Sequence, residues 1–143
     1  MRVFSRFLKR LAGRGGEAKL LSRSAFVGTW GEEKATEYLK ANGYTLLGRN
    51  VRPDKRDEID IVARIGDILV FIEVKTRRCE EYGRPFMAVD KEKRHALNRA
   101  AAAFLRKAKF PNLFYRFDVI EVLGQPEKGE PVIRHLDNAF PFE

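Results

Sequence analysis

The 143-residue sequence predicts one α/β domain, a mixed sheet flanked by helices in the element order αβββαββ. Two observations carry this prediction. Residues 58–75 alternate in side-chain character on either side of a Gly66-Asp67 turn, as expected for a β-hairpin. Two amphipathic segments, residues 29–43 and 90–108, precede and follow this hairpin and show helical periodicity.

Each element has a local signal. The first helix is expected to begin at Thr29, which forms a capping box with Glu32, and to end at Asn42-Gly43. Its apolar stripe contains Trp30 and Leu39. The second helix is expected over residues 90–108, and the strands over residues 44–49, 58–65, 68–75, 113–123 and 132–136. Residues 1–24 are treated as a basic N-terminal extension and residues 25–143 as the domain.

Composition limits the function classes. Hydrophobic residues make up 44% and charged residues 34%, which is typical of a folded domain. The longest apolar run, Ala100 to Leu105, is far shorter than the roughly 20 residues that span a bilayer. The single cysteine, Cys79, excludes an internal disulfide and a cysteine-based zinc cluster. We therefore expect a reduced, cytoplasmic protein that does not sit in a membrane.

The net charge of +8 is unevenly spread. Residues 1–24 hold seven basic side chains and one acidic side chain, and residues 74–109 hold eleven basic and four acidic ones. Residues 25–73, in contrast, hold seven basic and nine acidic side chains. An acid-rich segment beside basic ones suits metal-assisted chemistry on a polyanion, and a solvated surface is the alternative. The amphipathic pattern at residues 1–12 fits a DNA-contacting arm, a membrane-surface helix, a transit segment or a poorly ordered tail.

The hairpin turn fixes which side chains meet. With Ile65 opposite Ile68, one face pairs only apolar residues, from Ile65–Ile68 to Ile59–Val74, which supports this register. The other face then brings together four charged side chains at the open end of the hairpin, namely Glu58, Asp60, Glu73 and Lys75.

That charged cluster is costly for structure alone, because opposed carboxylates such as Asp60 and Glu73 repel one another. A shared proton would relieve the repulsion, and a divalent cation such as Mg²⁺ or Mn²⁺ would relieve it better. Metal-assisted phosphodiester hydrolysis would follow. Lys75 would orient the attacking water, act as a base or stabilise charge on phosphorus. The structural alternative is an exposed hairpin face that carries ion pairs.

Several short motifs together resemble a known family. They are Gly31-Glu32-x2-Ala35-x2-Tyr38-Leu39-x3-Gly43-Tyr44, Arg49-Asn50-x-Arg52, Glu58-Ile-Asp60, Phe71-Ile-Glu73-Val-Lys75-Thr-Arg77, Lys93 and Arg116-Phe-Asp118-Val-Ile. Over about residues 27–123 the chain resembles the YraN-like family of uncharacterised bacterial proteins. That family belongs to the restriction-endonuclease-like, PD-(D/E)XK nuclease superfamily and is similar to archaeal Holliday-junction resolvases.

The resemblance implies roles by position. Asp60, Glu73 and Lys75 correspond to the catalytic residues, and Glu32 joins Asp60 and Glu73 as a metal ligand. It implies an endonuclease-like protein acting on branched or single-stranded DNA in repair or recombination, and a homodimer by analogy. The family's usual Gly-Glu-Ile-Asp is Asp57-Glu58-Ile59-Asp60 here, so Asp57 replaces the glycine and is expected to add one more carboxylate near the site. A non-catalytic nucleic-acid-binding or adaptor protein that keeps the fold is the alternative.

Other residues receive weaker assignments. Arg77, Arg78 and Arg84 lie in or beside a charged loop that suits substrate contact, and Lys93 on the second helix is a further candidate for DNA binding. Glu58 and Asp118 are expected to support the site. Three of the assigned residues have a structural alternative. Glu32 would be a capping-box residue, Asp118 would form an ion pair with Arg116, and Lys93 would only solvate its helix. His95 and His135 are given no role.

Overall fold

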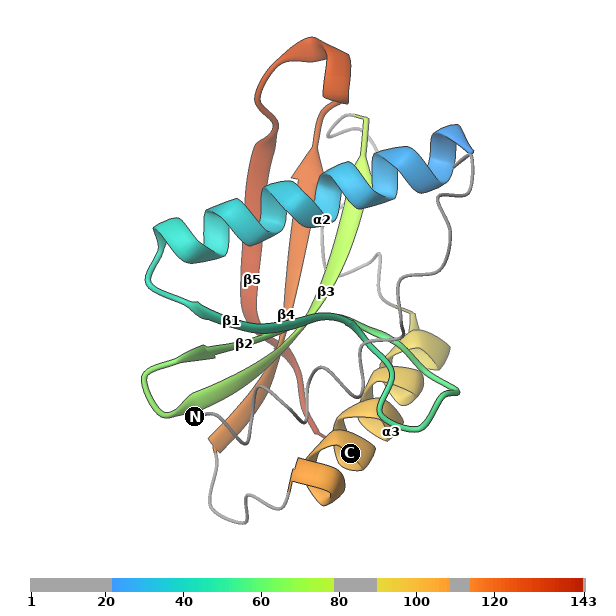
Figure 1. Cartoon of the computed structure of the whole chain (residues 1–143), viewed down its shortest axis with the longest axis vertical. Coiled ribbons are helices and arrows are strands. Elements are labelled where there is room, and N and C mark those ends of the chain that lie inside the picture. Colours follow the sequence, from blue (N-terminus) through green and yellow to red (C-terminus); the bar gives the residue numbers. More distant parts are fainter. Residues whose placement is uncertain (1–21, 79–89, 109–113, 143) are drawn as a thin grey trace.

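In the computed structural model, residues 22–78, 90–108 and 114–142 are described, and they form a five-stranded mixed sheet with one helix on each face (Figure 1). The element order is the one expected from the sequence, and the arrangement is consistent with a restriction-endonuclease-like fold. The N-terminal extension up to residue 21 and the loop at residues 79–89 lie outside the described residues.

The elements lie close to their predicted ranges. The helices are α2 (Arg23–Ala41) and α3 (Lys91–Ala108). The strands are β1 (Thr45–Val51), β2 (Ile59–Ile65), β3 (Ile68–Arg77), β4 (Phe114–Leu123) and β5 (Val132–Phe140), with a short 3₁₀ turn, η3 (Pro126–Lys128), before the last. The strands lie side by side in sequence order. Only β3 and β4 run parallel among these pairs, because α3 connects them as a crossover.

Each face of the sheet has its own apolar core. On one face Ala35 and Leu39 of α2 pack with Ile61, Val70 and Ile72, and Trp30 and Tyr38 lie at the margin, so the predicted stripe is confirmed. On the other face the core consists of buried residues of α3, β3 and β4, including Phe71, Leu97, Ala100, Phe104 and Phe117. Figure 1 shows α2 crossing the sheet at a distance from α3. The site described below lies at the edge where β2 and β3 part, between Glu32 of α2 on one side and Glu73, which pairs with Lys93 of α3, on the other.

The predicted start of the first helix is wrong. Helix α2 begins at Arg23, because the hydroxyl of Ser22 accepts a hydrogen bond from the backbone N–H of Ala25 at 3.2 Å and so caps the helix there. Thr29 lies inside the helix and donates to the carbonyl of Ala25 at 3.0 Å. Glu32 is therefore not a capping-box residue, and its plainer interpretation falls away.

The predicted hairpin register is confirmed from Ile65–Ile68 to Ile61–Ile72 and ends there. Beyond Ile61 the strands separate, so the expected backbone pairing of Asp60 with Glu73 does not form. The cause is local: the backbone N–H of Val74 bonds to the side chain of Asp60 at 2.9 Å instead of to the neighbouring strand. Ile59 consequently packs in the core on the α3 side, whereas Ile61 stays on the α2 side.

No helix within the described part of the chain is both long enough and apolar enough to cross a bilayer.

Candidate metal centre

Asp60 stands where β2 and β3 part. Because its carboxylate accepts the N–H of Val74, the side chain is tied to β3 although the residue belongs to β2. A charge-assisted bond of this kind orients the carboxylate. The break in pairing thus opens the space that the site occupies.

Three half-buried carboxylates converge at this break. Oxygen atoms of Glu32, Glu58 and Asp60 all lie within 4.8 Å of one another. Glu32 comes from α2, Asp60 comes from β2, and Glu58 immediately precedes β2. Burial, followed by the negative charge of Asp60, raises the pKa of Glu32 above its ordinary value. Like charges held this close favour binding of a cation, so the cluster can hold a metal ion.

Glu73, on β3, supplies a further carboxylate that interacts with Asp60, although it is not among the three whose oxygens lie within 4.8 Å of one another. Its side chain is only 5% exposed, and its Oε2 has no hydrogen-bond partner among the described residues. Burial, and then the charge of neighbouring Asp60, raise the pKa of Glu73 to about 8. The ammonium of Lys93, 3.6 Å from Glu73 Oε1, opposes this shift only in part. A buried oxygen without a donor is rare, and here it lies beside a carboxylate cluster.

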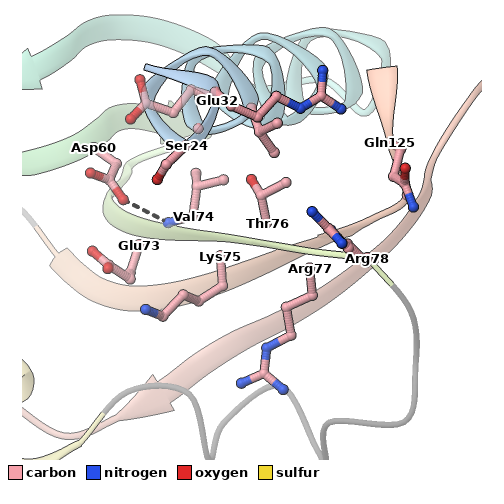
Figure 2. A pocket seen from close by; sticks show the side chains of 14 residues that line it. Ser24, Glu32, Asp60, Glu73, Val74, Lys75, Thr76, Arg77, Arg78 and Gln125 are labelled. Carbon is pink, nitrogen blue, oxygen red and sulfur yellow. Dashed lines mark hydrogen bonds between the residues drawn. The ribbon is translucent and has the colours of Figure 1, made fainter. Parts of the chain in front are cut away.

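A cleft of about 640 Å³ joins these residues to a row of cations. Figure 2 shows Glu32, Asp60 and Glu73 gathered at one side, with Lys75, Arg77 and Arg78 following along β3. Arg23, at the start of α2, also lines the cleft. The lining therefore changes from acidic to basic along β3, which suits a ligand that carries both a bound cation and negative phosphate groups.

The structure brings together the predicted Asp60, Glu73, Lys75 and Glu32, all of which line this cleft. Glu58 belongs to the same carboxylate cluster. The expected contribution of Asp57 differs: its carboxylate faces α3 and binds Arg99 at 3.2 and 3.3 Å.

Asp118 belongs to a separate polar network. It is fully buried on β4 and binds the guanidinium of Arg116 at 2.9 Å, His135 at 2.7 Å and the backbone N–H of Asn138 at 3.0 Å. His135 in turn contacts the hydroxyl of Tyr38 at 3.2 Å. The ion pair anticipated for Asp118 is present, and this residue neither joins the carboxylate cluster nor lines the cleft among the described residues.

The basic residues predicted to contact DNA fall into three groups. Arg77 and Arg78 line the cleft, and Lys93 instead forms an ion pair with Glu73. Arg84 lies outside the described residues.

No role was predicted from the sequence for the residues that surround the acids. Arg52 binds Glu58 at 2.8 Å, Arg49 lies 3.7 Å from Glu32, and the amide of Asn50 lies between these two acids. The available signal was the run Arg49-Asn50-x-Arg52, in which two cations and an amide interrupt a strand. It carried no information about which acids it would meet, because Glu32 is brought there by helix packing.

Comparison with known proteins gives a consistent result. A family model described as "Uncharacterised protein family UPF0102" matches residues 31–122. A "UPF0102 protein" from Caldicellulosiruptor saccharolyticus is 44% identical over 114 residues, which cover 80% of this chain and 96% of that protein. One from Trichlorobacter lovleyi is 41% identical over 131 residues, covering 91% of this chain and 95% of that protein. The matched region contains every residue of the carboxylate cluster.

Proposed function

The chain belongs to the uncharacterised protein family UPF0102, and from its carboxylate cluster we propose that it is a metal-dependent, endonuclease-like hydrolase of DNA phosphodiesters. Its substrates would be branched or single-stranded DNA in repair or recombination. The observation that carries the proposal is the unpartnered Oε2 of Glu73, buried in the cleft that Asp60 also lines. A cation would supply the interaction that this oxygen lacks.

The donor set suits Mg²⁺ or Mn²⁺. All of the candidate ligand atoms are carboxylate oxygens, which these hard cations prefer, and neither histidine nor cysteine joins the cluster among the described residues. Glu32, Asp60 and Glu73 would hold the ion, and Glu58 would support them. When bound, such an ion polarises a phosphoryl oxygen and makes a bound water more acidic.

The protein's own side chains would do the remaining work. Lys75 lines the cleft beside Glu73 and is a donor that can hold the attacking water or a phosphoryl oxygen. Arg77 and Arg78, farther along β3, would bind the phosphates of neighbouring nucleotides. Binding would then weaken steeply with added salt, because each neutralised phosphate releases counterions.

Cleavage assays with the full chain test this proposal. Single-stranded, duplex and four-way-junction DNA would be incubated with Mg²⁺ or Mn²⁺ and wild-type protein, Asp60→Asn or Lys75→Met. Both variants should lose cleavage by about 10³-fold or more while still binding DNA. Asp67→Asn, in the exposed hairpin turn, is the matched control and should cleave normally.

Two results would contradict the proposal. DNA binding that is equal in wild type and both variants, without cleavage under either metal, would identify the adaptor alternative. Cleavage that persists in Asp60→Asn at the wild-type rate would remove Asp60 from the reaction.

A further inference from the structure

Asn50 holds an unusual backbone conformation at the edge of the carboxylate cluster. It lies in β1, one residue before the end of the strand, with φ at +50°. L-residues rarely adopt this left-handed region, and asparagine tolerates it better than most. Because its neighbours Arg49 and Val51 pair regularly with Ile61 and Ile59, the turn of the backbone is confined to Asn50 itself.

The side-chain amide of Asn50 links two acids from different elements. With its nitrogen toward the acids, the amide lies 3.2 Å from Glu32 Oε2 and 3.0 Å from Glu58 Oε1. Both distances fit N–H···O hydrogen bonds, and one NH₂ group has two hydrogens to donate. Asn50 thereby connects α2 to the start of β2.

The chemistry of an amide suits this place. The carboxylates of Glu32, Glu58 and Asp60 repel one another at the distances observed. A lysine at position 50 would neutralise the charge that attracts a cation, whereas an amide donates to one oxygen of each acid and leaves the net charge unchanged. Oε1 of Glu32 takes no part in these contacts and stays available to a ligand, whereas Oε2 of Glu58 is held by Arg52 at 2.8 Å.

We infer that Asn50 is a positioning residue, which holds Glu32 and Glu58 in the arrangement that binds a divalent cation. This inference rests on the proposed metal site and adds to it a residue that touches neither the cation nor DNA. Partners that orient metal ligands commonly change metal affinity by about 10- to 100-fold when they are removed.

Asn50→Gly tests the inference, because glycine keeps the left-handed backbone and removes only the amide. Asn138→Gly is the matched control: Asn138 also has φ at +50°, lies on β5, and keeps the backbone N–H that binds Asp118. Binding of Mn²⁺ alone would be measured by titration calorimetry in the absence of DNA. Asn50→Gly should bind Mn²⁺ about 10-fold more weakly or worse, and Asn138→Gly should match wild type.

A metal-free measurement tests the contact itself. The drop in melting temperature caused by Asn50→Gly should be smaller in a Glu58→Ala background, where half of the contact is already lost. Equal drops in both backgrounds, or Mn²⁺ affinity unchanged by Asn50→Gly, would overturn the inference while leaving the metal site intact. Failure of the wild-type chain to bind Mn²⁺ would instead overturn the proposed function, and the metal-positioning role with it.

Discussion

Two buried carboxylates on neighbouring strands, Glu73 on β3 and Asp118 on β4, have opposite environments. Burial would raise the pKa of Asp118, yet hydrogen bonds from His135 and Arg116 hold that pKa below its ordinary value. Glu73 has burial and the charge of Asp60 acting in the same direction, and its pKa rises to about 8. Both side chains are at least 95% buried, so burial does not explain the difference.

The difference lies in the donors. Arg116, His135 and the backbone N–H of Asn138 donate to Asp118, and both carboxylate oxygens are used. At Glu73 one oxygen is left without a partner among the described residues. A buried carboxylate that the protein satisfies is part of the scaffold, whereas one left unsatisfied is available to a ligand.

The largest effect on stability is expected at the satisfied site. Asp118→Ala would leave the half-buried guanidinium of Arg116 and the ring of His135 without their acceptor. Loss of one partner of a buried ion pair typically destabilises a protein by about 3–5 kcal/mol. Urea unfolding would measure this, and Mn²⁺ affinity of the folded variant should be unchanged. A loss below about 1 kcal/mol would show that the network is not what fixes β4 to β5.

The second largest effect on stability is expected where α2 packs against β3, close to Glu73. A Cβ atom at Gly31 would collide with the hydroxyl oxygen of Thr76, so Gly31→Ala should push α2, and with it Glu32, away from β3. We expect a loss of about 1–3 kcal/mol in urea unfolding and weaker Mn²⁺ binding.

Gly28→Ala is the matched control, since it lies on the same helix with nothing within 4 Å of its added methyl group. It should stabilise the protein by about 0.5–1 kcal/mol, because alanine is the better helix former. If both variants behaved alike, close approach at Gly31 would not position the helix.

Glu73→Gln should change the free energy of unfolding in the opposite direction from Asp118→Ala. The raised pKa means that stability from the neutral form of Glu73 is fully present below its unfolded pKa near 4.5 and is lost as the pH rises through about 8. The substitution should therefore stabilise the metal-free protein by about 1 kcal/mol at pH 8, change it little at pH 4.5, and abolish Mn²⁺ binding. Destabilisation at pH 8 would mean that Glu73 is structural, like Asp118.

The sequence predicted the elements and much of the acidic site, because both depend on local patterns. The two-residue turn at Gly66-Asp67 set the register between Ile61 and Ile72, and that register was enough to bring Asp60 toward Glu73. The exception was the end of the β2–β3 pairing, where the side chain of Asp60 accepts the backbone N–H of Val74 in place of a backbone carbonyl. The alternation of side chains along a strand gives only the backbone register, and it cannot predict that a side chain will replace a backbone acceptor.

Long-range contacts were the part that the sequence did not give. Asp118 and His135 meet because β4 pairs with β5 across an irregular register between Phe117 and Val119, so no spacing rule connects them. Asn50 belongs to the motif Arg49-Asn50-x-Arg52, yet the role proposed for it depends on a left-handed backbone and on a helix packed over the sheet. These features come from tertiary structure.

The smallest predicted effect is a shift in the pH dependence of Mn²⁺ affinity, which distinguishes whether Lys93 acts on Glu73 or binds DNA. Carboxylate ligands must be ionised to bind a metal, so Mn²⁺ affinity should rise with pH until Glu73 has lost its proton near pH 8. Lys93 favours that loss from 3.6 Å, and its side chain is 42% exposed, so solvent weakens the interaction. Lys93→Gln should move the affinity profile to higher pH by less than about one unit. Lys91→Gln, on the exposed side of α3, should leave the profile in place. If Lys93→Gln instead weakened DNA binding in low salt and left the pH profile of Mn²⁺ affinity unchanged, Lys93 would bind the nucleic acid and would not influence the ionisation of Glu73.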